Sequence, residues 1–221
     1  MAIQLIGHTT GTIADVETTA KCLRTVVTPI VFKGSYAISY STNSTSPILA
    51  TTTTTNLAFR NTTSNIIQLN KVGVSLGYTA TTITAGQITF SLIKSQNAYT
   101  QDTAGTQIIP SRLRTAFPES SADIVVAAFP ATLTAGTRTL SSQSFSNVSA
   151  GSVRVDNIGV GPNKEVGSIS SLWDASTSYY PIVLESYDGF ILQVITGTFA
   201  ASSAPSVTLS INVNWDEYTG Y

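Results

Sequence analysis

Hydrophobic and polar residues alternate over much of the chain. The clearest case is residues 207–215, in which apolar side chains occupy every second position and Thr, Ser and Asn fill the positions between them. Residues 36–40, 72–78 and 88–92 show the same alternation. A period of two places the apolar side chains on one face of a β-strand, so each segment predicts a strand with one buried face. The apolar runs at 182–184 and 190–195 predict strands buried on both faces.

Turn-forming residues separate these segments, at 85–86, 102–105, 135–136, 159–162 and 187–189. Asp188-Gly189, between two apolar runs, is typical of a β-hairpin turn. The helical period of 3.6 is absent from long windows, although 111–116 and 168–173 each suit one helical turn. The pattern predicts an all-β fold: an antiparallel, jelly-roll-like β-sandwich with an extended N-terminal arm.

Three segments differ from the predicted sandwich. Residues 1–28 alternate only weakly and predict the extended arm, which leaves 29–221 as a single β-sandwich domain. Residues 41–56 include five consecutive threonines at 51–55 and predict a connector or a threonine-covered edge strand. Residues 97–150 predict long loops.

Charge is scarce. Asp, Glu, Lys and Arg make up 10% of the residues and give a net charge of −1, whereas charged residues are about a quarter of a typical soluble domain. The chain instead has 34 threonines and 28 serines. Such a chain offers no electrostatic attraction for nucleic acid or anionic lipid, so we expect neither as a partner. Residues 124–129, the longest apolar stretch, are much shorter than a membrane helix, and the start lacks the pattern of a signal peptide.

The residue inventory disfavours metal and nucleophilic chemistry. Cys22 is the only cysteine and His8 the only histidine. This excludes an internal disulfide framework and a cysteine-based zinc site, and it disfavours a histidine-dependent triad. Asp174, Glu185 and Asp188 lack the spacing of a calcium-binding loop. We expect no metal and no cofactor.

Two pairs of carboxylates are candidates for the acid and nucleophile of a glycoside hydrolase: Glu185 with Asp188, and Asp216 with Glu217. A turn explains Asp188 equally well, and Asp216 and Glu217 suit the solubilising end of the last strand. We therefore expect no catalytic residues and no enzymatic activity.

Aromatic residues are frequent in the C-terminal part and suggest a platform for sugar rings as an alternative to packing or subunit contact. They are Trp173, Tyr179, Tyr180, Tyr187, Trp215, Tyr218 and Tyr221. The phase of Trp215 within 207–215 predicts that this side chain lies in the core.

A nearly uncharged, hydroxyl-rich surface suits a protein that is packed into an assembly, because small hydroxyl groups are less costly to desolvate than charges. The tip of the predicted arm carries Ile3, Leu5 and Ile6. These side chains are too apolar for a free tail. We therefore predict that they form a partner-binding element that lies along a neighbouring subunit.

Both ends of the chain resemble a group of tailed-phage virion proteins. The similar residues near the start are 15–24 (DVETTAKCLR), Pro29, 34–37 (GSYA) and 57–61 (LAFRN); near the end they are 172–173 (LW), 180–184 (YPIVL), 188–190 (DGF) and 213–217 (VNWDE). The resemblance covers about half of the chain. It implies a small β-sandwich or jelly-roll component of a particle, of the kind that decorates or cements a capsid as a homotrimer.

The sequence-based hypothesis is therefore a non-enzymatic capsid cement or decoration protein of a tailed phage. Its expected partners are the major capsid protein and further copies of itself, in a virion assembled in the host cytoplasm. One alternative is a tail, baseplate or fibre component that binds a host glycan. A second alternative is a β-sandwich glycan hydrolase that uses Glu185 and Asp188.

Overall fold

All the secondary structure is β-strand in the part of the chain that the structure describes. This computed structural model describes residues 13–17, 22–26, 31–44, 52–79, 88–150, 164–177, 181–196 and 206–219. These residues form fourteen strands and no helix. Accordingly, no helix among them is long and apolar enough to cross a membrane.

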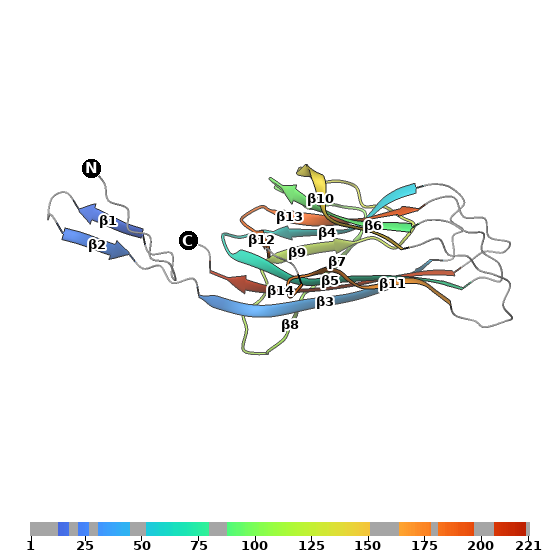
Figure 1. Ribbon diagram of the computed structural model, residues 1–221, viewed down its shortest axis with the longest axis horizontal. Helices are drawn as coiled ribbons and strands as arrows, with labels where there is room; N and C mark the ends of the chain where they lie inside the picture. Colours follow the sequence, from blue (N-terminus) through green and yellow to red (C-terminus); the bar gives the residue numbers. More distant parts are fainter. Residues whose placement is uncertain are drawn as a thin grey trace.

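Two antiparallel sheets pack face to face, which confirms the predicted all-β, antiparallel β-sandwich (Figure 1). The first sheet consists of β3 (Phe32–Ser44), β5 (Ile66–Thr79), β8 (Ser111–Arg112), β11 (Lys164–Asp174), β12 (Ile182–Leu184) and β14 (Ser206–Tyr218). The second consists of β4 (Thr52–Asn61), β6 (Ile88–Gln96), β7 (Thr106–Ile108), β9 (Ala122–Val126), β10 (Thr139–Ala150) and β13 (Gly189–Thr196).

The eight principal strands pair as a nested series. β3 pairs with β14, β4 with β13, β5 with β11 and β6 with β10, all antiparallel. The first and third pairs belong to the first sheet, in the order β11-β5-β14-β3. The second and fourth belong to the second sheet, in the order β10-β6-β13-β4. The chain is therefore arranged as one long hairpin whose paired arms alternate between the two sheets.

The core lies between the sheets, where the period-two pattern predicts it. Trp215, with the three preceding apolar residues at alternate positions of β14, is completely buried. The indole of Trp215 stacks on Tyr36 with ring centroids 5.9 Å apart and meets Phe59 edge-on at 5.1 Å. Phe59 in turn stacks on Phe190 at 4.8 Å. These rings come from both sheets, so aromatic contacts join the two layers.

The N-terminal segment contains a small hairpin. β1 (Ile13–Glu17) and β2 (Cys22–Val26) pair antiparallel as a two-stranded sheet of their own. This pairing lies within residues 1–28. Ile3, Leu5, Ile6 and His8 are outside the described residues, so the partner-binding role of the arm and its boundary with the sandwich stay predictions.

The turn at Asp188-Gly189 does not close a hairpin, contrary to the sequence-based prediction. β12 pairs with β5 in the first sheet, whereas β13 lies between β4 and β6 in the second. The turn therefore carries the chain from one sheet to the other. β13 is largely buried as predicted, but Val183 of β12 is 39% exposed. β12 is thus buried on one face only.

Three further local predictions are decided by pairing with distant strands. Residues 168–173 belong to β11 and 111–112 to β8, so neither segment is helical. Residues 52–55 extend β4 and pair with β13, whereas β9 pairs with β4 only from Leu57 onward. The edge-strand alternative is therefore correct for 52–55, and residues 45–51 lie outside the described residues. The region 97–150 contains four strands, β7 to β10, besides its loops.

Candidate interaction surface

The outer face of the first sheet has a floor of small uncharged side chains. Because the apolar residues of β14 point into the core, the residues between them point outward. In the register of the sheet, Ser210 lies between Ser41 and Ser75, Asn212 between Ser39 and Gly73, and Asn214 between Ala37 and Lys71. Three adjacent strands thus present hydroxyl and amide groups on one surface, which we call the outer face.

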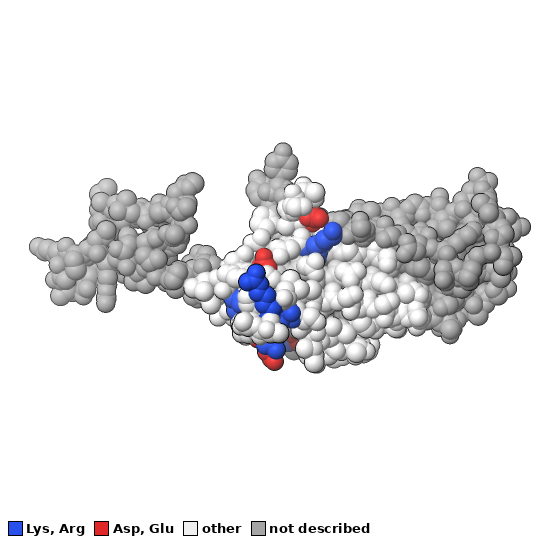
Figure 2. Space-filling model, turned by 90° about the horizontal axis from the view of Figure 1, so that it is seen from below, with Lys and Arg blue, Asp and Glu red and all other residues white. Residues whose placement is uncertain are grey.

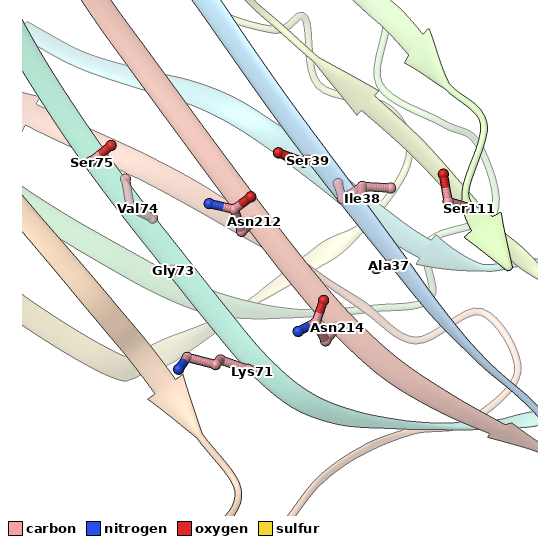
Figure 3. Close-up of a pocket in the computed structure, with 10 residues that line it drawn as sticks. All are labelled: Ala37, Ile38, Ser39, Lys71, Gly73, Val74, Ser75, Ser111, Asn212 and Asn214. Carbon is pink, nitrogen blue, oxygen red and sulfur yellow. The ribbon is translucent and has the colours of Figure 1, made fainter. Parts of the chain in front are cut away.

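The outer face contains a hollow of about 490 Å³. Gly73 and Ala37 add almost no bulk to its floor, and Ser111 contributes from the edge strand β8. Figure 3 shows Asn212 and Asn214 projecting from β14 into this region. Both side chains are exposed, and neither amide has a hydrogen-bond partner among the described residues. Their donors and acceptors are available to an external partner.

A loop beside the hollow exposes two large apolar side chains. The loop, residues 109–119, begins around β8, which pairs with β3, and Leu113 N donates to Ser35 O at 3.0 Å. The side chains of Ile109 and Leu113 are 88% and 60% exposed. In Figure 1 the loop next to β8 projects below β3, away from the second sheet. Apolar side chains of this size on a projecting loop are suited to insertion into a partner's pocket.

The base of this loop is fixed by aromatic and guanidinium contacts. Arg112 Nη1 donates to Phe117 O at 3.0 Å, and the guanidinium of Arg114 lies 5.9 Å from the centroid of the Phe117 ring. Phe117 also meets Phe32 edge-on at 5.7 Å. The loop is therefore anchored at its base, which lowers the entropy cost of holding Leu113 in a binding conformation.

Charged side chains are unevenly distributed over this side of the molecule. In Figure 2 the Lys and Arg residues gather towards the end at which β3 begins, and most of the remaining described surface is white. The lysine at the rim of the hollow, Lys71, faces Asp174 at 3.8 Å. The outer face is therefore nearly neutral where β3, β14 and β5 run side by side.

Glu217 corrects a sequence-based prediction. We expected Asp216 and Glu217 to form a solubilising strand end, but the side chain of Glu217 is completely buried. Its Oε1 accepts hydrogen bonds from Ser120 Oγ at 2.5 Å, Ser121 N at 2.8 Å and Trp215 Nε1 at 3.2 Å. Its Oε2 accepts from Ser121 N at 3.0 Å and from Lys33 Nζ at 3.3 Å.

This cluster is a structural clamp. Glu217 lies at the end of β14 and binds the segment that leads into β9, while Lys33 Nζ also donates to Ser121 Oγ at 2.9 Å. Nearby, Tyr36 donates to Pro118 O at 3.0 Å. Burial, reinforced by the negative charge of Glu217, raises the pKa of Tyr36 to about 12. The hydrogen-bonding capacity of the Glu217 carboxylate is therefore taken up by donors of the framework, and little is left for chemistry.

The other candidate acids serve different local contacts. Asp188 forms an ion pair with Lys94 at 2.8 Å, whereas Glu185 is exposed. Asp174 accepts from Ser176 N at 2.9 Å, and Asp216 accepts from Ser35 Oγ. No group of three His, Cys, Asp or Glu side chains suited to a metal ion occurs within the described ranges. Cys22 opens β2, and its side chain is not described.

The candidate aromatic residues divide between core and surface. Trp215 is in the core, as its phase predicts, and Tyr218 packs against Phe32 at 5.6 Å. The Nε1 of Trp173 is buried with no hydrogen-bond partner among the described atoms. Tyr187 is 43% exposed and contacts Tyr99. Tyr99 was not among the aromatic residues predicted from the sequence. Tyr179, Tyr180 and Tyr221 are outside the described residues.

Sequence reasoning also missed the exposed loop residues Ile109 and Leu113. Their only signal in the sequence is the presence of two large apolar residues in a region without period-two alternation.

Comparison with known proteins adds no identity: no protein-family model, curated protein or solved structure matches this chain.

Proposed function

We propose that the chain is a structural, non-enzymatic protein of a phage particle, a capsid cement or decoration protein that docks through the outer face of its first sheet. The family resemblance at both ends of the sequence supports this role. The fold supports it too, because the structure is an antiparallel β-sandwich and two-sheet sandwiches of the jelly-roll type recur in viral capsid domains. Because one fold serves many functions, the role of this chain follows from its surface rather than from its fold.

The observation that carries the proposal is the combination of a neutral outer face with the projecting loop beside it. Asn212 and Asn214 offer amides that have no hydrogen-bond partner within the described part of the chain, and Ile109 and Leu113 offer apolar area. Full burial of one such apolar side chain contributes about 1.5–3 kcal/mol. A mechanical role needs only a modest gain at each contact, because the gain is repeated over many copies of the protein on one particle.

The placement of the acids favours a structural role over the hydrolase alternative. Of the pair Glu185 and Asp188, the latter is held by Lys94 at 2.8 Å. Of the pair Asp216 and Glu217, the latter is buried among donors that all belong to the framework. A retaining glycosidase needs two carboxyl groups facing a common substrate.

The partners in this proposal are the major capsid protein and further copies of the chain, as a homotrimer in the virion. The N-terminal tip, with Ile3, Leu5 and Ile6, would extend each contact onto a neighbouring subunit. The outer face and the tip would then serve different partners, which makes their contributions separable by mutation.

Particle occupancy tests the proposal. Particles from the producing culture are purified, labelled with antibody against this protein, imaged at low resolution and quantified by mass spectrometry. We expect label over the capsid and a fixed ratio to the major capsid protein. Label confined to the tail, or no protein in the particles, would refute the proposal. Light scattering of the isolated protein should give the mass of a trimer.

Matched variants test the docking surface itself. In re-binding to particles that lack the protein, the double variant Ile109→Asp with Leu113→Asp should lose most of its occupancy, because it places charge in the contact. The control is Leu140→Asp, which changes a 40% exposed apolar side chain in the second sheet. Equal occupancy of the double variant and the control would show that the outer face is not the docking surface.

A further inference from the structure

Two exposed tyrosines lie side by side on loops of the second sheet. Tyr99, shortly after β6, is 58% exposed, and Tyr187, just before β13, is 43% exposed. Their ring centroids are 5.2 Å apart and the ring planes are inclined by 53°. The two rings thus form an open corner, which we call the tyrosine pair. The residues of the outer face take no part in it.

The backbone at the tyrosine pair is held in an unfavourable conformation. Tyr187 has a φ of 61° and Asn97 a φ of 53°. Asparagine tolerates this left-handed region, whereas a bulky aromatic residue is rarely found there. Such a conformation persists only where surrounding contacts enforce it, and it is concentrated at sites where a side chain must be presented in one direction.

The surrounding contacts are a set of hydrogen bonds that join both loops to β4. Tyr187 N donates to Asn61 O at 3.1 Å, and Ala98 N donates to Tyr187 O at 2.8 Å. Arg60 Nη1 donates to Tyr99 O at 2.8 Å, and Arg60 is itself fixed by Asp123 at 2.7 Å. The backbone of both tyrosines is therefore held in place in advance of any binding, which lowers the entropy cost of a contact with a ligand.

The neighbourhood of the rings is polar. Asp188, the residue after Tyr187, pairs with Lys94 at 2.8 Å, and both side chains are partly exposed. Tyr99 Oη donates to Asn97 Oδ1 at 3.3 Å, and Tyr99 N donates to Thr137 O at 3.1 Å. Aromatic faces surrounded by hydrogen-bonding groups suit a ligand that has an apolar face and a polar edge.

We propose that Tyr99 and Tyr187 form a binding site for a pyranose ring of a glycan. A sugar ring has C–H groups on its faces, which pack on the negatively charged face of an aromatic ring, and hydroxyl groups on its rim, which Lys94 and Asp188 can bind. A protein partner would be expected to need a larger apolar surface than two tyrosine rings. This site is independent of the docking role, because it uses loops of the other sheet.

Titration of tyrosine ring signals tests the proposal. The intact protein is labelled with ¹³C in its nine tyrosines, and the signals of Tyr99 and Tyr187 are assigned with the variants Tyr99→Phe and Tyr187→Phe. The probes are maltotriose, N,N′,N″-triacetylchitotriose and tri-galacturonic acid, each added to millimolar concentration. We expect one probe to shift these two ring signals with saturation, while the other tyrosines stay unchanged. No saturable shift with any probe, or shifts at other tyrosines only, would overturn the proposal.

Two ring-removing variants sharpen the test. Tyr187→Asn removes the ring while keeping a residue that tolerates the left-handed backbone, so loss of folding is avoided. Tyr99→Ala removes the other ring, and the control Leu113→Ala removes an exposed apolar side chain elsewhere. Each tyrosine variant should weaken binding of the active probe about tenfold, the effect expected when one aromatic contact is lost. Unchanged affinity in both, or an equal loss in Leu113→Ala, would overturn the site.

Discussion

Replacing Glu217 with glutamine tests whether the buried clamp stabilises the sandwich. The change keeps the size of the side chain, removes its charge and turns one acceptor oxygen into a donor NH2 group. If the NH2 group takes the place of Oε2, it faces Lys33 Nζ at 3.3 Å and Ser121 N at 3.0 Å. If it takes the place of Oε1, it faces donors of Ser120, Ser121 and Trp215. With the NH2 group at the Oε1 position, the buried Trp215 Nε1 loses its acceptor; with it at the Oε2 position, Lys33 loses its charged partner.

The expected cost follows from these contacts. Hydrogen bonds to a charged group each contribute about 1.5–3 kcal/mol, and removal of one member of a buried ion pair costs about 3–5 kcal/mol. Lys33 is 20% exposed and can turn towards water, so the lower end of this range applies. We expect Glu217→Gln to lower the free energy of unfolding by about 3 kcal/mol. For a chain of this length that corresponds to a fall in Tm of about 6–12 °C.

Urea denaturation followed by tryptophan fluorescence measures this change. The matched control is Asp216→Asn, because Asp216 is the neighbouring carboxylate and is only half-buried, with Ser35 Oγ as its partner. The control should change the free energy of unfolding by less than about 1 kcal/mol. A change of the same small size in Glu217→Gln would refute the clamp. Addition of Lys33→Met to Glu217→Gln should cost less than the sum of the single changes.

Two further predictions concern the same end of the sandwich. Gly189→Ala should lower the free energy of unfolding, measured by urea titration, by about 2 kcal/mol or more. The reason is that the new Cβ would lie 2.1 Å from Phe59 O within the β13–β4 pairing. An unchanged free energy of unfolding would mean that this pairing relaxes freely. Tyr36 is the second case. Its folded pKa of about 12 exceeds the ordinary value of 10. The contribution of this group to stability should therefore be constant below pH 10 and should fall above it, towards a total loss of about 2.7 kcal/mol once the pH exceeds the folded value. Tyr36→Phe should remove the loss of stability at alkaline pH that is due to Tyr36. The loss due to Tyr218, whose pKa is also raised by burial, should remain. An unchanged dependence of stability on alkaline pH would contradict the role given to Tyr36.

The strands of the core could be predicted because their signal is local. The alternation in 207–215 predicts one buried face of β14, and the apolar residues at 209, 211, 213 and 215 are all completely buried. The same phase continues to position 217, so periodicity alone would have placed Glu217 inside the sandwich. Acidic residues are usually exposed, which favoured the opposite prediction. The donors that make burial of Glu217 tolerable come from residues 33, 120 and 121, which are distant in the sequence.

The failures have a common physical origin in long-range pairing. Asp188-Gly189 has the composition of a hairpin turn, but β12 and β13 each find a partner strand in a different sheet. Residues 168–173 form part of β11 because β5 is available beside them. The exposed positions of Ile109 and Leu113 depend on how the loop leaves β8. None of these partners is visible in a short window of sequence.

The nested pairing also has a consequence for how the protein is made on the ribosome. β14 lies between β3 and β5, so the first sheet has a gap in its middle until residues 206–218 have left the exit tunnel. Until then β3 and β5 each have an unpaired edge, and the nascent chain is open to pairing with other chains. Closure of the sandwich is therefore expected to wait until β14 has emerged and inserted between β3 and β5.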